Sequence, residues 1–168
     1  WGMGLGFQSY SGKGTPINIE APSIYAPIQK LTPWVAIQKL LEDSDQNKSL
    51  QVVRKNYTEG FLAPHIVIPR SLPSSKRLRA SYAEYDFSFE TSLCAITVPD
   101  TMEGRNNAKV LTAFLNSSFV GWYLGTSLGL AVYRPRFSPS LLLSLPFPNP
   151  EDLPNEEKAT TARHEIIH

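Results

Sequence analysis

The sequence has very little cysteine, histidine and charge. It contains one cysteine, Cys94, and three histidines in 168 residues, and 18% of the residues are charged, against roughly 25% in soluble domains generally. One cysteine excludes an intramolecular disulfide, and a structural zinc site needs about four Cys or His ligands at short spacings, which this sequence does not offer. We therefore predict a buried, reduced thiol at Cys94, as in a reducing compartment such as the cytoplasm, and no metal site.

The composition also limits the broad class of protein. Lys and Arg number 16 and Asp and Glu 15, so the net charge is +1 and the chain as a whole has no field that would attract nucleic acid or a membrane surface. A hydrophobic fraction of 42%, with 11% aromatic residues, excludes an intrinsically disordered chain. The length predicts one compact domain with a core of its own.

One stretch is long enough to span a membrane but has an unsuitable composition. Residues 110–133 carry no charged side chain over 24 positions. Three glycines and six Ser, Thr or Asn residues interrupt the stretch, which a lipid-exposed helix would not favour. We predict a buried helix followed by a glycine-rich turn, and no membrane partner.

The N-terminal part predicts turns and short strands. Residues 1–27 carry five glycines and three prolines. A short helix is expected at residues 33–41, because Thr32 can cap it and Pro33 suits the first helical position. The polar run at residues 42–49 predicts an exposed loop.

The middle of the chain predicts β-structure. Residues 65–68 form a compact apolar strand closed by Pro69, and residues 78–89 and 93–98 are expected to pair as a hairpin. Because the strand at 93–98 is apolar on both faces, we expect it to be central in a sheet that helices cover on both sides.

A long helix is expected at about residues 107–124, with Asn106 or Asn107 as its cap. Its apolar face, expected to lie on the sheet, consists of Leu111, Phe114, Leu115, Phe119 and Trp122. Together these elements predict an α+β fold with a twisted, mostly antiparallel sheet covered by a few helices.

The chain is expected to divide into three parts. Residues 1–56 form a strand- and turn-rich N-terminal part of the same domain, and residues 57–150 form the core. Residues 151–168 begin a C-terminal helix, with acidic residues in its first turn, that the sequence truncates.

No catalytic or cofactor-binding set can be assembled from the sequence. Gly2, Gly4 and Gly6 lack the preceding strand and following helix of a phosphate-binding loop, so we expect a tight turn there. No Ser-His-Asp or Cys-His arrangement is apparent. We therefore predict neither catalysis nor a cofactor within this chain.

The distribution of charge is more informative than its sum. Residues 70–79 hold four basic side chains and no acid, and residues 1–150 have 14 Lys and Arg against 10 Asp and Glu, or +4. Arginine and serine in a loop after a rigid strand are suited to phosphate contacts, although an ordinary solvated loop has the same composition. The candidate DNA-binding residues are Arg70, Ser75, Lys76, Arg77, Arg79, Tyr133, Arg134 and Arg136.

The order of motifs resembles a known family. The segments are FLAPHIVIPR at residues 61–70, RLRASY at 77–82, LTAFLNSSF at 111–119, YRPR at 133–136 and LLSLPFP at 142–148. This series is similar to the C-terminal target-recognition region of bacterial adenine-N6 DNA methyltransferases, including fused restriction-modification enzymes of phage defence. It also resembles, more distantly, the specificity subunits of type I restriction systems.

The resemblance implies sequence-specific recognition of duplex DNA by a domain that presents the target base to a separate catalytic domain of the same parent chain. The family's Asn/Asp-Pro-Pro-aromatic motif and its S-adenosylmethionine loop are absent from this sequence. The fragment is therefore expected to recognise DNA, while the parent supplies methyl transfer and binds S-adenosylmethionine. The alternative is a protein-interaction or scaffolding domain within a larger bacterial defence protein.

Overall fold

The computed structural model describes residues 2–6, 17–18, 51–52, 58–72, 77–89, 91–126, 139–147 and 156–167. The helix expected at residues 33–41 and the loop expected at 42–49 lie outside this part of the chain. The strands are β1 (Gly2–Leu5), β2 (Ile17–Asn18), β3 (Gln51–Val52), β4 (His65–Pro69), β5 (Ser81–Ala83) and β6 (Leu93–Thr97). The helices are the 3-10 helix η2 (Thr58–Phe61) and the α-helices α2 (Met102–Leu115), α3 (Ser118–Thr126), α4 (Pro139–Leu143) and α5 (Glu156–Ile167).

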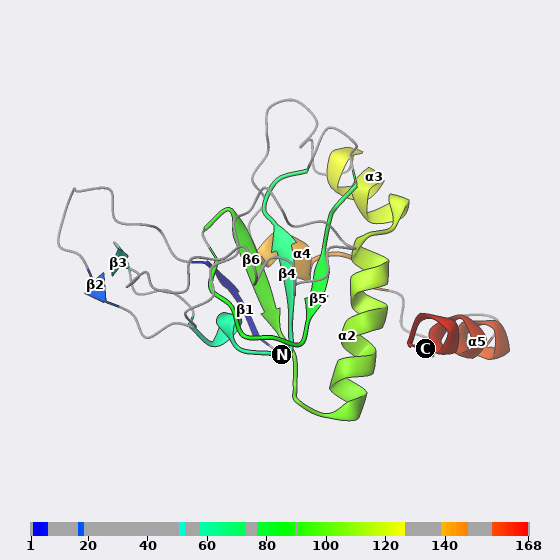
Figure 1. Ribbon diagram of the computed structural model, residues 1–168. Coiled ribbons are helices and arrows are strands. Elements are labelled where there is room, and N and C mark those ends of the chain that lie inside the picture. Colours follow the sequence, from blue (N-terminus) through cyan, green and yellow to red (C-terminus); the bar gives the residue numbers. More distant parts are fainter. Residues whose placement is uncertain are drawn as a thin grey trace.

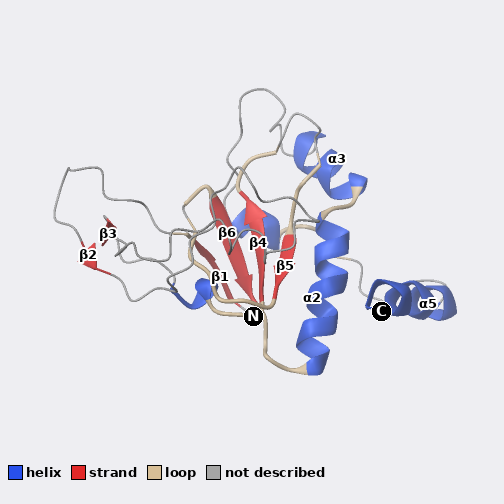
Figure 2. Ribbon diagram, in the orientation of Figure 1, coloured by secondary structure: helices blue, strands red, loops and turns tan. Residues whose placement is uncertain are grey.

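The main sheet has four antiparallel strands in the order β1-β6-β4-β5, and β2 pairs separately with β3 (Figure 1). Helices α2, α3 and α4 lie around this sheet, and α5 lies beyond α2 (Figure 2). This arrangement confirms the predicted α+β class. No helix in the described part of the chain is long and apolar enough to cross a membrane.

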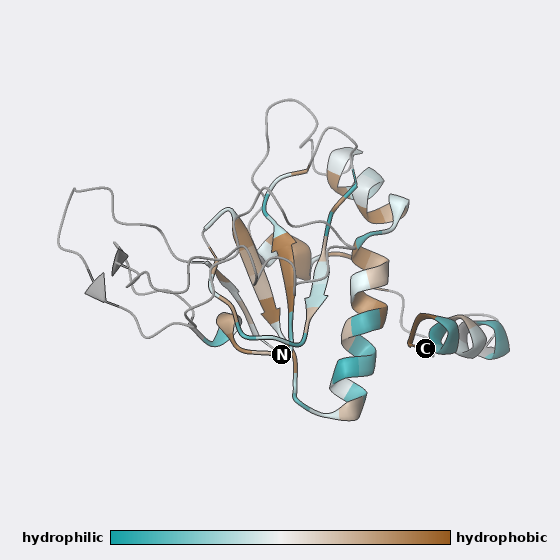
Figure 3. Cartoon of the chain, viewed as in Figure 1, coloured by the Kyte–Doolittle hydropathy of each residue, from teal (hydrophilic) through white to brown (hydrophobic). Residues whose placement is uncertain are grey.

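Strands β4 and β6 are the centre of the sheet and are buried on both faces. Both strands are largely hydrophobic (Figure 3). Ile66 lies opposite Ile96, and Ile68 opposite Cys94, so these four side chains share one face. That face packs in one cluster with buried side chains of the helices, among them Leu115 of α2. The prediction of a central strand at residues 93–98 is confirmed.

Within the described residues, the opposite face of the sheet is covered by aromatic rings and by no α-helix, whereas we expected helices on both faces. Phe61 of η2 meets Phe89 edge to face, with ring centroids 5.0 Å apart. Phe87 packs in the same way against His65, at 4.8 Å. Large rings bury enough apolar area for this short segment to replace a second helical layer.

The predicted hairpin of residues 78–89 and 93–98 is wrong, because β4 lies between β5 and β6. Strand β5 ends at Ala83, and the chain then turns away toward η2. The Asp86 carboxylate accepts a hydrogen bond from the Ala63 amide at 2.7 Å, and the Phe87 amide donates to the Phe61 carbonyl at 3.0 Å. These bonds direct Phe87 and Phe89 across the sheet face and so prevent continued strand pairing.

The glycines near the N-terminus also differ from expectation. Gly2 and Gly4 belong to β1, which pairs with β6, instead of forming a tight turn. The Gly2 amide donates a hydrogen bond of 2.7 Å to the Thr97 hydroxyl of β6. Within the described residues, the N-terminus therefore serves as an edge strand of the main sheet.

The helix predicted at about 107–124 is two helices, α2 and α3, separated at Asn116 and Ser117. Helix α2 begins earlier than expected because Thr101 is the N-cap, and its hydroxyl accepts a hydrogen bond from the Gly104 amide at 3.0 Å. Gly104 is needed there, since an added Cβ would lie 2.3 Å from the Pro99 carbonyl oxygen. Asn106 and Asn107 lie inside α2 and do not cap it.

The expected C-terminal helix is present as α5, and it packs on α2. The Lys109 ammonium donates to the carbonyl of Ile167 at 3.3 Å, near the end of α5 where carbonyls lack helical partners. Arg163 of α5 donates to the side-chain oxygen of Asn107. Two side chains of α2 thus hold α5 against it.

Cys94 is buried as predicted. Its thiol lies 3.6 Å from the Ile68 carbonyl, and burial raises the pKa of Cys94 to about 12 despite the nearby charge of Arg70. The thiol therefore stays protonated at neutral pH, and it acts as a small apolar side chain of the core.

His65 is a buried titratable group in a layer rich in aromatic rings. Its side chain is fully buried against Phe87, and within the described residues its two ring nitrogens have no hydrogen-bond partner of normal geometry. Burial lowers the pKa of His65 to about 4, although the backbone of Leu62 and the Asp86 carboxylate act in the opposite direction. Folding therefore favours the neutral imidazole.

We expect the free energy of unfolding to decrease as the pH falls from about 6.5 to about 4, by about 3 kcal/mol in total. In that range the unfolded chain binds a proton at His65 and the folded chain does not, so acid favours unfolding. Urea denaturation at several pH values measures this effect, with His65→Leu as the control that removes the titration. An equal pH dependence in wild type and His65→Leu would contradict the assignment.

Candidate nucleic-acid interface

The connection from β4 to β5 carries the basic segment that the sequence singled out. It leaves the sheet after Pro69 and returns to it at Ser81, at the end of the sheet beside α3 (Figure 1). Three of the predicted DNA-binding residues belong to its described part, namely Arg70, Arg77 and Arg79. The other predicted residues, Ser75, Lys76, Tyr133, Arg134 and Arg136, lie outside the described residues.

Arg70 forms hydrogen bonds within the protein. Its guanidinium donates a hydrogen bond of 3.0 Å to the Thr91 carbonyl, and its backbone amide donates to the Ser92 carbonyl at 2.9 Å. Both acceptors belong to the turn that precedes β6, so Arg70 joins that turn to the end of β4. The side chain is half-buried, with less freedom to contact a ligand than an exposed arginine has.

Arg77 and Arg79 alternate with two core residues. Leu78 and Ala80 are fully buried in the cluster beneath the helices, while Arg77 and Arg79 are exposed. Within the described residues neither arginine forms an ion pair. An extended segment anchored at every second position keeps the intervening side chains on its outer side, so both guanidinium groups are available to solvent.

Asn116 fixes the end of this segment. Its side-chain oxygen accepts a hydrogen bond of 2.9 Å from the Ala80 amide, and its side-chain nitrogen donates one of 2.8 Å to the Ala80 carbonyl. The side chain thus pairs with a backbone peptide as a neighbouring strand would. This contact gives the LNSS motif a structural role and connects the end of α2 to the residue that follows Arg79.

We expect Asn116→Ala to lower the free energy of unfolding by about 1 to 3 kcal/mol, because it removes two hydrogen bonds to partly buried backbone groups. The Ala80 amide should also exchange its hydrogen faster. Asn106→Ala is the matched control, since Asn106 lies in the same helix and makes no such contact. Denaturant unfolding and amide exchange measure the two effects, and equal stability of both variants would exclude the proposed role of Asn116.

The acidic side chains near this part of the sheet lie toward the start of α2. Arg105 contacts Asp100 at 2.7 Å and Glu84 at 3.3 Å, and Tyr82 donates to Glu84 at 3.0 Å. Burial, together with the contact to Glu84, raises the pKa of Tyr82 to about 12. Because Arg105 offsets part of their charge and they lie at the opposite end of α2 from Asn116, these two carboxylates oppose anion binding near Arg79 only weakly.

Helix α3 exposes aromatic rings that the sequence analysis assigned to the apolar face on the sheet. Phe119 is 43% exposed and Trp122 is 58% exposed, whereas Val120 and Leu124 are fully buried. The break after α2 changes which residues of α3 face the core, so the spacing of a single continuous helix does not apply. The apolar residues Val120 and Leu124, four apart, are the signal that marks the buried face.

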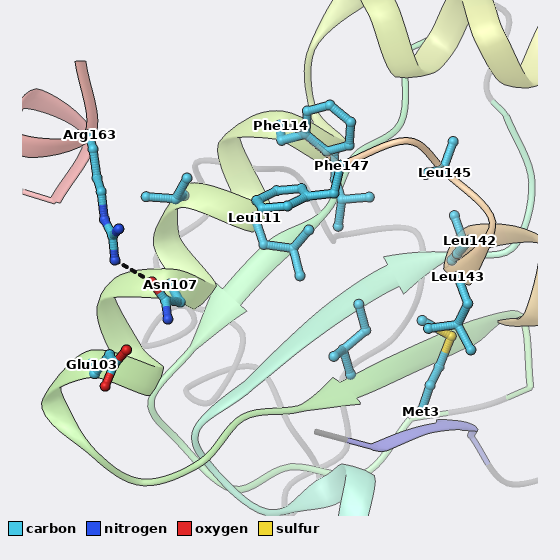
Figure 4. Close-up of a pocket in the computed structure, with 13 residues that line it drawn as sticks. Met3, Glu103, Asn107, Leu111, Phe114, Leu142, Leu143, Leu145, Phe147 and Arg163 are labelled. Carbon is cyan, nitrogen blue, oxygen red and sulfur yellow. Dashed lines mark hydrogen bonds between the residues drawn. The ribbon is translucent and has the colours of Figure 1, made fainter. Parts of the chain in front are cut away.

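A second feature, absent from the sequence analysis, is an apolar pocket of about 490 Å³ between α2 and α4 (Figure 4). Its polar end contains Asn107, hydrogen-bonded to Arg163, and also Glu103. Its apolar lining includes Met3, Leu111, Phe114, Leu142, Leu143, Leu145 and Phe147. Its residues come from five separate segments, so no single sequence motif indicates it.

Within the described residues, no three His, Cys, Asp or Glu side chains come together to hold a metal ion. No protein-family model matches the sequence, and no curated protein shows a significant match to it. Among the predicted site residues that the structure describes, Arg77 and Arg79 are exposed and offer charge and hydrogen bonding from a fixed backbone.

Proposed function

We propose that this chain is the DNA-recognition module of an adenine-N6 DNA methyltransferase or of a fused restriction-modification enzyme. The resemblance of its motifs supplies the class. The observation that supports it best is the exposure of Arg77 and Arg79 on a backbone that the buried Leu78 and the Asn116 contact hold in place. A guanidinium group on a fixed backbone can form paired hydrogen bonds with a phosphate or with a guanine edge.

In this proposal the module binds duplex DNA and the catalytic domain of the parent chain performs the methyl transfer, in the bacterial cytoplasm. The fragment contributes contacts that orient the DNA and offset the energy needed to extrude the target base. S-adenosylmethionine belongs to the catalytic domain.

We expect Arg77→Gln together with Arg79→Gln to weaken binding of the full-length protein to duplex DNA. The plot of log affinity against log salt concentration should become less steep by about 1 for each arginine that contacts a phosphate. Lys158→Gln, an exposed change on α5, is the control. Fluorescence anisotropy at several salt concentrations measures both quantities. Unchanged affinity and slope in the double variant would exclude this interface.

The apolar pocket favours a second candidate function, docking of a partner domain. Leu143 lines the pocket and is 72% exposed, which is unusual for a leucine without a partner. We expect Leu143→Asp to disrupt association with the parent's other domains while leaving the free energy of unfolding nearly unchanged. Leu62→Asp, at a leucine that is 51% exposed, is the control. Size-exclusion chromatography of the separated domains tests this, and equal association of both variants with the partner would contradict it.

A further inference from the structure

Two neighbouring aromatic rings stand on the outer side of α3. Phe119 and Trp122 are one turn apart, with centroids 6.2 Å apart and planes inclined by 37°, and both are substantially exposed. The opposite side of the helix is buried through Val120 and Leu124. Because the helix is anchored by its inner side, the two outer rings have a fixed origin and lose little freedom on binding a flat ligand.

Helix α3 and the segment that carries Arg77 and Arg79 lie at the same end of the sheet (Figure 1). Leu78, Val120 and Leu124 belong to one core cluster, so the segment of Arg77 and Arg79 and helix α3 pack on common neighbours. Asn116, whose side chain bonds to the backbone of Ala80, lies two residues before the start of α3. Two cations and two exposed rings therefore occur on adjoining segments, at the same end of the sheet.

We propose that Phe119 and Trp122 form a stacking platform for an unpaired base of bound DNA, while Arg77 and Arg79 hold the adjacent phosphates. This inference rests on the proposed function, since it concerns the same interface and adds what the interface does with a base. Extrusion of a target adenine from a duplex leaves one or more bases without stacking partners. A ring platform beside cations compensates for that loss.

The charges at this surface favour nucleic acid over a protein partner. Helix α3 contains no acidic residue, so nothing on it repels phosphate. Every base has a flat π-face, and stacking on an aromatic side chain does not depend on the base sequence. The platform therefore contributes affinity, and recognition of the target sequence depends on other contacts.

The test measures how tightly the full-length protein binds two single-stranded DNAs. One is an oligothymidylate of about 20 nucleotides, and the other is an abasic strand of the same length. Both strands offer the same phosphates, but only the first offers bases. Trp122→Leu should weaken binding of oligothymidylate by about 5- to 150-fold and leave binding of the abasic strand unchanged. Trp122→Phe should retain most of the affinity, because it keeps a ring that can stack.

The matched control is Tyr85→Ala, which removes a ring that is 49% exposed and lies away from α3. It should change neither affinity. Trp122 is exposed, so the leucine variant is expected to fold, and thermal unfolding of each variant checks this.

Three results would overturn the proposal. The first is an equal loss of affinity for both DNA strands in Trp122→Leu, and the second is no loss of affinity for either strand. The third is that the wild-type protein binds oligothymidylate no more tightly than the abasic strand. If the arginine double variant still weakens duplex binding in any of these cases, DNA recognition stands without base stacking. If that variant also binds duplex DNA normally, the proposed function fails as well.

Discussion

The burial of β4 and β6 on both faces is the constraint on which the rest of the structure depends. Two strands with apolar side chains in both directions cannot face water on either side, so each face requires a cover. Helices α2, α3 and α4 supply one cover, and the rings around Phe61 supply the other. The second cover includes the buried His65, which makes the folded state sensitive to acid.

The same constraint shapes the candidate interface. Leu78 and Ala80 are part of the helical-side cluster, so the path from β4 to β5 is held along the core where it approaches β5. Alternation then exposes Arg77 and Arg79. Asn116 completes the arrangement, because its side chain satisfies both the backbone amide and the backbone carbonyl of Ala80. Stability and the presentation of the arginines thus depend on the same contacts.

The sequence was sufficient to predict the elements whose signals are local. The apolar run that begins at His65, the buried Cys94 and the helix that begins near residue 156 were all predicted, because burial and capping leave a pattern in neighbouring residues. The pairing of the strands could not be predicted. The choice between β4 and β5 as the neighbour of β6 depends on contacts such as the one between Asp86 and the Ala63 amide. The pocket and the break at Asn116 likewise depend on residues distant in sequence.

Which of the candidate interface residues are exposed could not be predicted from the sequence. Charge is visible in composition, so the basic segment was identified, but exposure is a property of the packed structure. Arg70 is half-buried and bonded to Thr91, while Trp122, expected on the sheet, is exposed. An apolar ring at helical spacing predicts burial only while the helix is continuous, and the break after α2 removes that condition.

A net charge of +1 also has a different meaning once the surface is known. Affinity that depends on phosphate contacts falls steeply with salt, so the exposed Arg77 and Arg79 would contribute little to the proposed interface at physiological ionic strength. Stacking on Phe119 and Trp122 removes apolar surface from water and does not weaken in this way. DNA binding as proposed for this lightly charged domain therefore needs a contribution of the second kind, and the exposed rings of α3 are proposed to make it.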